Sequence, residues 1–156
     1  MRRNVSLFLT PKGLSCPDRV IPVSIGKGGI TKRPKECDPT TPRGEHEIIG
    51  MLYRPDRMQK PRDWAMPILL NSFWSNDVKD PDYNLMVPFS NKYSRKKLRI
   101  SVPSYDLIIL TDWNWPAAIK GRGSAFFIHQ WNQIKTPTEG SIAMSRRNLR
   151  WLASKI

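Results

Sequence analysis

GRGSAFFIHQWNQIKTPTEGSIAM, the stretch from Gly121 to Met144, carries the strongest indications of fold and chemistry in this sequence. Within it, Ala125–His129 is a continuous apolar run that ends in a histidine. A run of this length and composition predicts a strand that is buried on both faces. A short polar turn, Thr138–Ser141, follows before the next apolar residues. The stretch therefore predicts a buried strand with a histidine at its end and a polar turn soon after it.

The histidine and the turn together indicate a candidate reaction centre. His129 and Ser141 supply the imidazole and the hydroxyl that a general base and a nucleophile need. Gly140 has no Cβ, so the backbone N–H groups beside it can point to one place and form an oxyanion hole. The alternative is a structural histidine at the end of a strand. On these residues alone, the structural interpretation is the more common one.

The rest of the chain predicts a β-rich domain with one helix. Further strands are expected at 5–10, 19–25, 45–53, 68–70 and 105–111, with a turn at 11–13 between the first two. Residues 80–87 are expected to form a turn followed by a short strand. A basic helical turn is expected at 91–99. At the end of the chain, Leu149, Leu152, Ala153 and Ile156 share one face of a helix, and Ser145 is its expected N-cap. The predicted fold class is mainly β, a single domain over residues 1–156 with short helices and one C-terminal helix.

Composition limits the classes of function. The 26 Lys and Arg residues against 13 Asp and Glu give a formal charge of +13. Such a charge suits an anionic surface, nucleic acid or a substrate with several carboxylates. The basic residues are spread over predicted loops and no known nucleic-acid motif is present, so nucleic acid is not favoured as a partner. The sequence does not indicate an oligomeric state.

The sequence also predicts that no metal or cofactor is used. Cys16 and Cys37 have neither CxxC nor metal-ligand spacing, and there are two histidines. Residues Met1–Arg3 are basic, but the apolar run after them, Val5–Leu9, is shorter than a signal peptide needs. No run has the length of a membrane span. We therefore expect a cytoplasmic protein with no membrane partner.

Two motifs occur in a fixed order along the chain. The upstream motif is Thr41-Pro42-Arg43-Gly44-Glu45-His46, and the downstream motif is His129 followed by Thr138-Glu139-Gly140-Ser141-Ile142. The order and content of both motifs resemble the L,D-transpeptidase (YkuD) family, in which the downstream motif has cysteine where this chain has Ser141. The approach Gly121–Ala125 also looks like one branch of that family. The resemblance spans most of the chain and implies a YkuD-like β-sandwich.

The resemblance also implies a reaction. In the YkuD family a cysteine thiolate attacks the carbonyl of the L-centre of a peptidoglycan stem peptide, releases D-alanine and leaves a thioester that an amine or water resolves. If the family's roles apply to the matching positions of this chain, Ser141 stands at the nucleophile position and His129 is the base, oriented by a backbone carbonyl. The N–H groups around Gly140 and Ser141 would form the oxyanion hole.

The chain departs from the family in two places. Ser141 replaces the cysteine, and a hydroxyl has a much higher pKa than a thiol, so a site suited to a thiolate should activate it poorly. Three interpretations are open, namely an engineered inactive variant, a natural serine enzyme and a natural pseudoenzyme. We favour the engineered variant because His129 and Gly140 are intact. The second departure is Ala143, where many members have an arginine that helps to bind the substrate carboxylate.

Several residues are candidates for substrate binding. Arg122 and Arg146, or the neighbouring Arg147, could replace the missing arginine, although a surface role is an equal alternative. Thr138 lies in the turn itself. Three residues of the clusters at 82–84 and 112–115 are candidates for the cleft wall, with core or loop packing as the alternative: Tyr83, Asn84 and Trp113.

These inferences predict a peptidoglycan enzyme. A cytoplasmic YkuD-like protein would meet soluble, recycled muropeptides, so we expect an L,D-carboxypeptidase that trims a tetrapeptide to a tripeptide, with transpeptidation as the second possibility. The chain as given would then be an inactive variant of that enzyme. The alternatives are a catalytically inactive muropeptide-binding protein and, less favoured, a basic nucleic-acid-binding domain.

Overall fold

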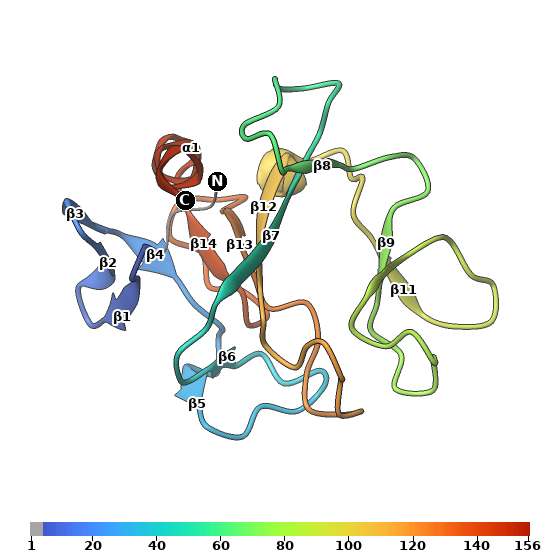
Figure 1. The fold of residues 1–156 in the computed structure, drawn as a ribbon. Coiled ribbons are helices and arrows are strands. Elements are labelled where there is room, and N and C mark those ends of the chain that lie inside the picture. Colours follow the sequence, from blue (N-terminus) through green and yellow to red (C-terminus); the bar gives the residue numbers. More distant parts are fainter. Residues whose placement is uncertain (1–4) are drawn as a thin grey trace.

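The centre of the structure is a six-stranded sheet built around the most apolar strands. The computed structural model describes residues 5–156, and in it the sheet has the order β4-β14-β13-β12-β7-β8 (Figure 1). β12 pairs antiparallel with β7 and β13, and β13 pairs parallel with β14. The bounds are β4 Val23–Ser24, β7 Ile48–Tyr53, β8 Met66–Pro67, β12 Leu107–Thr111, β13 Phe127–Gln130 and β14 Ile142–Met144.

Smaller elements surround this central sheet. One three-stranded sheet has the order β1-β2-β3, another has the order β10-β9-β11, and β5 pairs with β6. A single turn of 3₁₀-helix, η1, precedes β12, and α1 ends the described chain. The bounds are β1 Phe8–Thr10, β2 Gly13–Cys16, β3 Arg19–Ile21, β5 Ile30–Thr31, β6 Thr41–Pro42, β9 Phe73–Ser75, β10 Met86–Val87, β11 Arg95–Lys97, η1 Pro103–Tyr105 and α1 Arg146–Lys155. The mainly β fold with one C-terminal helix confirms the predicted fold class.

Both faces of the central sheet are covered, as its continuous apolar strands require. Successive residues of a strand point to opposite faces. Accordingly, Ile109 and Ile128 belong to one buried cluster with the apolar face of α1, whereas Ile108 and Phe127 belong to a second cluster. The second cluster includes Trp74 of β9. In Figure 1, α1 and the β9–β11 strands accordingly lie on opposite sides of the β7–β12 strands.

The C-terminal helix begins where the sequence predicts. The side chain of Ser145 accepts a hydrogen bond from the backbone N–H of Asn148 at 3.2 Å, which satisfies one of the free donors of the first turn. Leu149, Leu152 and Ala153 are buried against the sheet.

Four predictions about secondary structure need correction. The turn at 11–13 joins β1 to β2, which the sequence did not reveal, and β2 then pairs with β3. Residues 91–99 contain the strand β11 and no helical turn, because Arg95–Lys97 pair along β9. The strand expected at 68–70 lies two residues earlier, as β8. The apolar residues after the turn at Thr138–Ser141 form a strand, β14, that the sequence did not predict. The basic residues 1–3 lie outside the described part of the chain.

The packing of Phe127 gives a prediction about stability. Its side chain is 1% exposed and meets the rings of Trp74 and Tyr105 edge to face, at 4.9 and 6.1 Å between centroids. Phe127→Ala should lower the free energy of unfolding by about 3–5 kcal/mol, because it leaves a cavity between two layers. Urea unfolding measures the change. Phe8→Ala is the matched control, since Phe8 is 63% exposed, and it should change the stability by less than about 0.5 kcal/mol. Equal losses in the two variants would contradict the assignment of the core.

Candidate active site

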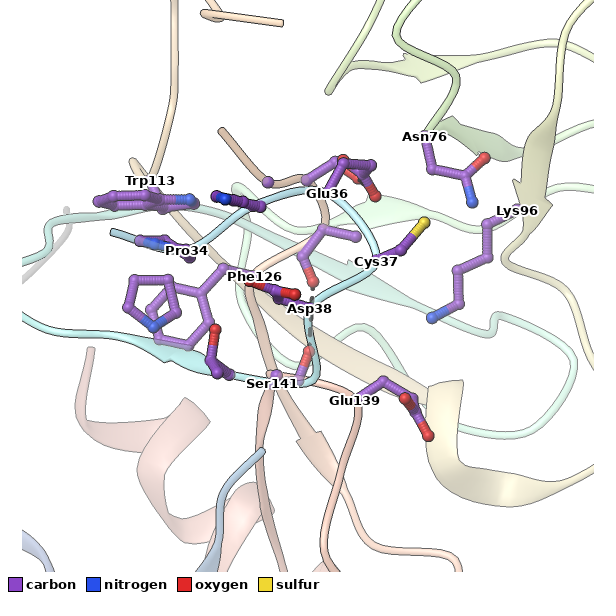
Figure 2. A pocket seen from close by; sticks show the side chains of 17 residues that line it. Pro34, Glu36, Cys37, Asp38, Asn76, Lys96, Trp113, Phe126, Glu139 and Ser141 are labelled. Atoms are coloured by element: carbon purple, nitrogen blue, oxygen red, sulfur yellow. Dashed lines mark hydrogen bonds between the residues drawn. The ribbon is translucent and has the colours of Figure 1, made fainter. Parts of the chain in front are cut away.

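A pocket of about 210 Å³ lies beside the starts of β13 and β14, where the segments that precede these strands meet residues 34–42. Figure 2 shows Ser141 at its base, with Trp113 and Pro34 on one side and Asn76 and Lys96 on the other. Its walls come from segments that are far apart in the sequence. They are Pro34–Asp38, Thr40, Pro42, Asn76, Lys96, Trp113, Gly123–Phe126 and Glu139–Ser141.

Ser141 sits immediately before β14, next to the strand that carries the histidine. Because Ile142 pairs with Ile128 in a parallel register, Ser141 lies beside Phe127 on the neighbouring strand. The backbone N–H of Phe127 donates to Ser141 Oγ at 3.2 Å, and Ser141 Oγ donates to the carbonyl of Ala125 at 3.2 Å. The hydroxyl is therefore held against the adjacent strand at the wall of the pocket.

His129 projects from the same face of the sheet as Ser141. It pairs with Ala143, two residues after Ser141, so both side chains point toward the β9–β11 side. Within residues 5–156, the hydrogen bonds of Ser141 Oγ go to backbone groups and not to this ring. The two side chains are thus neighbours on adjacent strands without a hydrogen bond between them.

The surroundings of His129 keep its imidazole neutral and fix its orientation. Nδ1 lies 2.7 Å from the carbonyl of Gln130, and a carbonyl can only accept, so Nδ1 carries the hydrogen and Nε2 has the free lone pair. Burial lowers the pKa of His129 to about 4, against the opposing effect of this hydrogen bond, and the charge of Lys96 lowers it further. The ring of Tyr105 packs edge to face on it at 5.2 Å. At neutral pH the imidazole is therefore uncharged and oriented.

The turn before Ser141 is closed by threonine hydroxyls. Thr138 Oγ1 donates to the carbonyl of Ser141 at 2.5 Å and accepts from the N–H of Gly140 at 3.1 Å. The fully buried Thr41 donates to the carbonyl of Gly140 at 2.7 Å and accepts from the N–H of Gly26 at 2.9 Å. Thr138 therefore braces the turn, a role different from the substrate contact expected for it.

The bond from Thr41 also fixes the direction of the Ser141 N–H. In a trans peptide the C=O and the N–H point in opposite directions. Because Thr41 holds the carbonyl of Gly140, the N–H of Ser141, which belongs to the same peptide, points away from Thr41. An oxyanion hole needs a donor whose direction is fixed in this way. Thr41 is a supporting residue that the sequence reasoning did not single out, although it begins the upstream motif.

The histidine of the upstream motif supports the aromatic wall. His46 packs edge to face against Trp113 at 5.7 Å and against Phe126 at 5.1 Å. Its Nε2 lies 3.3 Å from the carbonyl of Pro42. Trp113 and Phe126 both line the pocket, so His46 acts on the site through them.

Asn84 is placed behind the wall of the pocket and has no free hydrogen-bonding group to offer. Its Oδ1 accepts from Trp74 Nε1 and from the N–H of Ala125, both at 3.0 Å. Its Nδ2 donates to the carbonyls of Trp113 and Asn114. The side chain is 3% exposed. We therefore assign Asn84 to positioning the wall, in place of the substrate contact expected from the sequence.

Tyr83 has a similar supporting role. Its hydroxyl donates to the carboxylate of Glu36 and accepts from the N–H of Gly123 at 3.1 Å. Ser124 Oγ donates to the other oxygen of Glu36 at 3.0 Å. Burial, with Glu36 next in importance, raises the pKa of Tyr83 well above its usual range. This cluster ties the loop that carries Cys37 to the segment that leads into β13.

The expected arginines lie elsewhere. Arg122 is exposed and stacks on Trp113 at 5.0 Å, where it lines a separate, shallow depression with Arg43 and Asp112. Arg146 is exposed in the first turn of α1 and is not among the residues that line the pocket.

The pocket is lined instead by two lysines, Lys35 and Lys96, and by the exposed thiol of Cys37. Cys37 has a φ of 67°, an uncommon conformation for a residue other than glycine. The sequence showed Lys96 only as part of a basic cluster and Cys37 only as an unpaired cysteine.

Gly140 provides a test of the turn geometry. Its φ is 142°, and a Cβ at this position would lie 2.8 Å from the carbonyl oxygen of Thr40. Gly140→Ala should therefore lower the free energy of unfolding by about 3 kcal/mol, from backbone strain and a clash with backbone. Gly29→Ala is the control, because its φ is 78° and its Cβ would meet nothing within 4 Å, so the loss should be about 1 kcal/mol. Urea unfolding compares them, and equal losses would show that the contact with Thr40 is unimportant.

The comparison with protein families agrees with this geometry. The family model for the L,D-transpeptidase catalytic domain, YkuD, matches residues 9–156. No significant match was found among curated proteins or among solved structures. In the described part of the chain no helix is long and apolar enough to cross a membrane. With a match over nearly the whole chain, and with both of its motifs meeting at one pocket, the chain belongs to the YkuD family of L,D-transpeptidase catalytic domains.

Proposed function

We propose that the site catalyses L,D-carboxypeptidase chemistry, the trimming of a muropeptide tetrapeptide to a tripeptide with water as the acyl acceptor. YkuD enzymes act on peptidoglycan stem peptides. The observation that carries the proposal is the neutral, oriented imidazole of His129, which lies on the strand and sheet face next to residue 141, while residue 141 itself lines the pocket. The pocket volume of about 210 Å³ suits the short C-terminal end of a peptide.

The geometry supports the following sequence of steps. The side chain of residue 141 attacks the carbonyl carbon, and its proton passes to His129 Nε2. The N–H of Ser141, whose direction Thr41 fixes through the carbonyl of Gly140, would stabilise the resulting oxyanion. His129 then returns the proton to the departing amine of D-alanine, which leaves an acyl-enzyme. Water deprotonated by His129 hydrolyses this ester or thioester and restores the side chain.

Serine at position 141 should make the chain as given a poor catalyst. Its hydroxyl is held by two backbone groups, and the imidazole beside it has a pKa of about 4 and is thus a weak base. A second candidate function follows from the same observation, namely a muropeptide-binding protein that holds the peptide without cleaving it. The pocket serves both functions, and turnover distinguishes them.

Restoring the thiol tests the proposal. Ser141→Cys should release D-alanine from a disaccharide tetrapeptide at least about a hundredfold faster than the chain as given, because a thiol forms its anion far more readily. Mass spectrometry follows the loss of D-alanine. Adding His129→Gln to the Ser141→Cys variant should remove about two orders of magnitude or more of the gain.

Cys37 requires a control in this assay because its thiol lines the same pocket. Both proteins should therefore also be assayed with Cys37→Ala. If the chain as given releases D-alanine and only Cys37→Ala abolishes the release, the nucleophile is Cys37 and the assignment of residue 141 is wrong. If the peptide binds but Ser141→Cys does not cleave it, the binding function replaces the enzymatic one.

The pKa of His129 predicts the pH dependence. In the Ser141→Cys protein, kcat/KM should be maintained as the pH falls through 6.5, the ordinary pKa of histidine, and decline only near pH 4, because the neutral ring is the active form. The unfolded chain binds this proton from about pH 6.5 downward and the folded chain only near pH 4, so stability should also fall across this window as the pH is lowered. An acid limb near pH 6.5 in the rate profile would contradict the buried base.

A further inference from the structure

Lys96 brings a positive charge to the pocket from a strand outside the central sheet. It is the middle residue of β11, it is exposed, and it lines the pocket together with Ser141. Figure 2 shows Lys96 on the side opposite Trp113, with its ammonium group directed away from Asn76 and toward the middle of the pocket. The position of Lys96 is determined by two sets of contacts.

The strand register turns Lys96 toward the reaction centre. Lys96 pairs with Trp74 on β9, so the two side chains share one face of their sheet. Trp74 packs on Phe127, which lies beside Ser141, and this face therefore looks onto the catalytic strand. Lys97, the next residue, pairs with Phe73 and points to the opposite face.

Tyr105 places the ammonium group close to the base. Lys96 Nζ lies 4.9 Å from the centroid of the Tyr105 ring, and the same ring contacts His129 at 5.2 Å. The charge is thus one aromatic ring away from the imidazole. A negative group held by Lys96 would lie beside the reacting carbonyl.

The acidic residues around Lys96 are mostly engaged elsewhere. Glu36 is held by Tyr83 and Ser124, and Glu139 pairs with Lys27. Within residues 5–156, no ion pair of Lys96 with an acid is present. Asp38 is the remaining acid of the pocket and would oppose the binding of an anion.

We propose that Lys96 binds the free α-carboxylate of the D-amino acid that leaves, and so restricts the site to the C-terminal residue of a stem peptide. The proposal rests on the function proposed above. A carboxylate held beside the reacting carbonyl identifies a terminal residue, because a peptide extended or amidated at that end has no charge there. Lys96 takes the place in this chain of the arginine that was expected at Arg122 or Arg146.

A pair of ligands that differ only in this charge tests the proposal. Isothermal titration of the chain as given should compare a tetrapeptide with a free C-terminal carboxylate and the same peptide with a C-terminal carboxamide. The carboxylate form should bind roughly five- to tenfold more tightly, the range for an accessible charge-assisted hydrogen bond. Lys96→Gln should reduce this preference to less than about twofold, and Lys96→Arg should keep most of it.

Two further variants separate a specific subsite from general charge. Lys97→Gln removes the same charge one residue away on the outer face, so the preference should remain. Asp38→Asn removes the opposing charge in the pocket, so the carboxylate peptide should bind more tightly while the amide changes less. A preference that survives Lys96→Gln, or that Lys97→Gln removes equally, would overturn the proposal.

Turnover separates this proposal from the function on which it rests. In the Ser141→Cys protein, Lys96→Gln should raise KM for D-alanine release by roughly fivefold and change kcat less, since the charge acts on binding. If D-alanine is released and Lys96→Gln leaves KM unchanged, the function stands and the role of Lys96 is wrong. If Ser141→Cys neither binds nor cleaves the tetrapeptide, both proposals fall together.

Discussion

The hydrogen bond from the Thr41 hydroxyl to the carbonyl of Gly140 is the contact on which the site depends. Thr41 is fully buried, and it joins two segments that are distant in the sequence, with Gly26 as a third partner. A buried hydroxyl must find partners, so it specifies one arrangement of the backbone around it. That arrangement fixes the orientation of the peptide bond between Gly140 and Ser141. It also leaves no room for a Cβ atom at position 140, so only glycine fits there. The two motifs of the sequence are therefore two halves of one structural unit.

The second requirement of the site is a rigid wall opposite the catalytic strand. The β9–β11 sheet provides it through a buried ion pair, in which Arg95 donates to Asp80 at 2.7 Å and Ser75 donates to the same carboxylate. The Arg95 guanidinium, as the main cause, lowers the pKa of Asp80 to about 2. Removing one partner of such a pair leaves an uncompensated charge, which makes the arrangement hard to change. Arg95 precedes Lys96 directly, so the ion pair also fixes the residue that faces the pocket.

The elements of this fold that the sequence predicted are those whose formation depends on residues within the element itself. β7, β12 and β13 are continuous apolar runs, and α1 has both an apolar face and a cap at Ser145. The strands that were missed or misplaced are short, and they exist because a distant strand offers a hydrogen-bonding edge, as β9 does for β11. No local pattern contains that information.

The same distinction applies to the residues of the site. His129, Gly140 and Ser141 could be chosen from their spacing, because they lie on adjacent strands with one turn between them. Asn84, Lys96 and Cys37 reach or support the pocket from other parts of the chain. Asn84 looked like a ligand-binding residue because its type suits that role. Only the hydrogen-bond partners of its amide group show that both the oxygen and the nitrogen of the side chain are already engaged inside the protein.

Burial of His129 has two opposite effects on its proposed role as the base. It keeps the ring neutral at physiological pH, so that Nε2 is always able to accept a proton, but it also makes the ring a weak base, with a pKa of about 4. A cysteine, with an ordinary pKa of ~8.5, already has to give its proton to a poorer acceptor, and a serine hydroxyl holds its proton far more tightly. The energy for that transfer must come from stabilising the negative charge as it develops. The fixed N–H of Ser141 has the right sign to supply it, as do the positive charges of Lys35 and Lys96, which both line the pocket. A binding-competent site with serine at position 141 and little turnover is therefore the outcome that the electrostatics of the pocket favour.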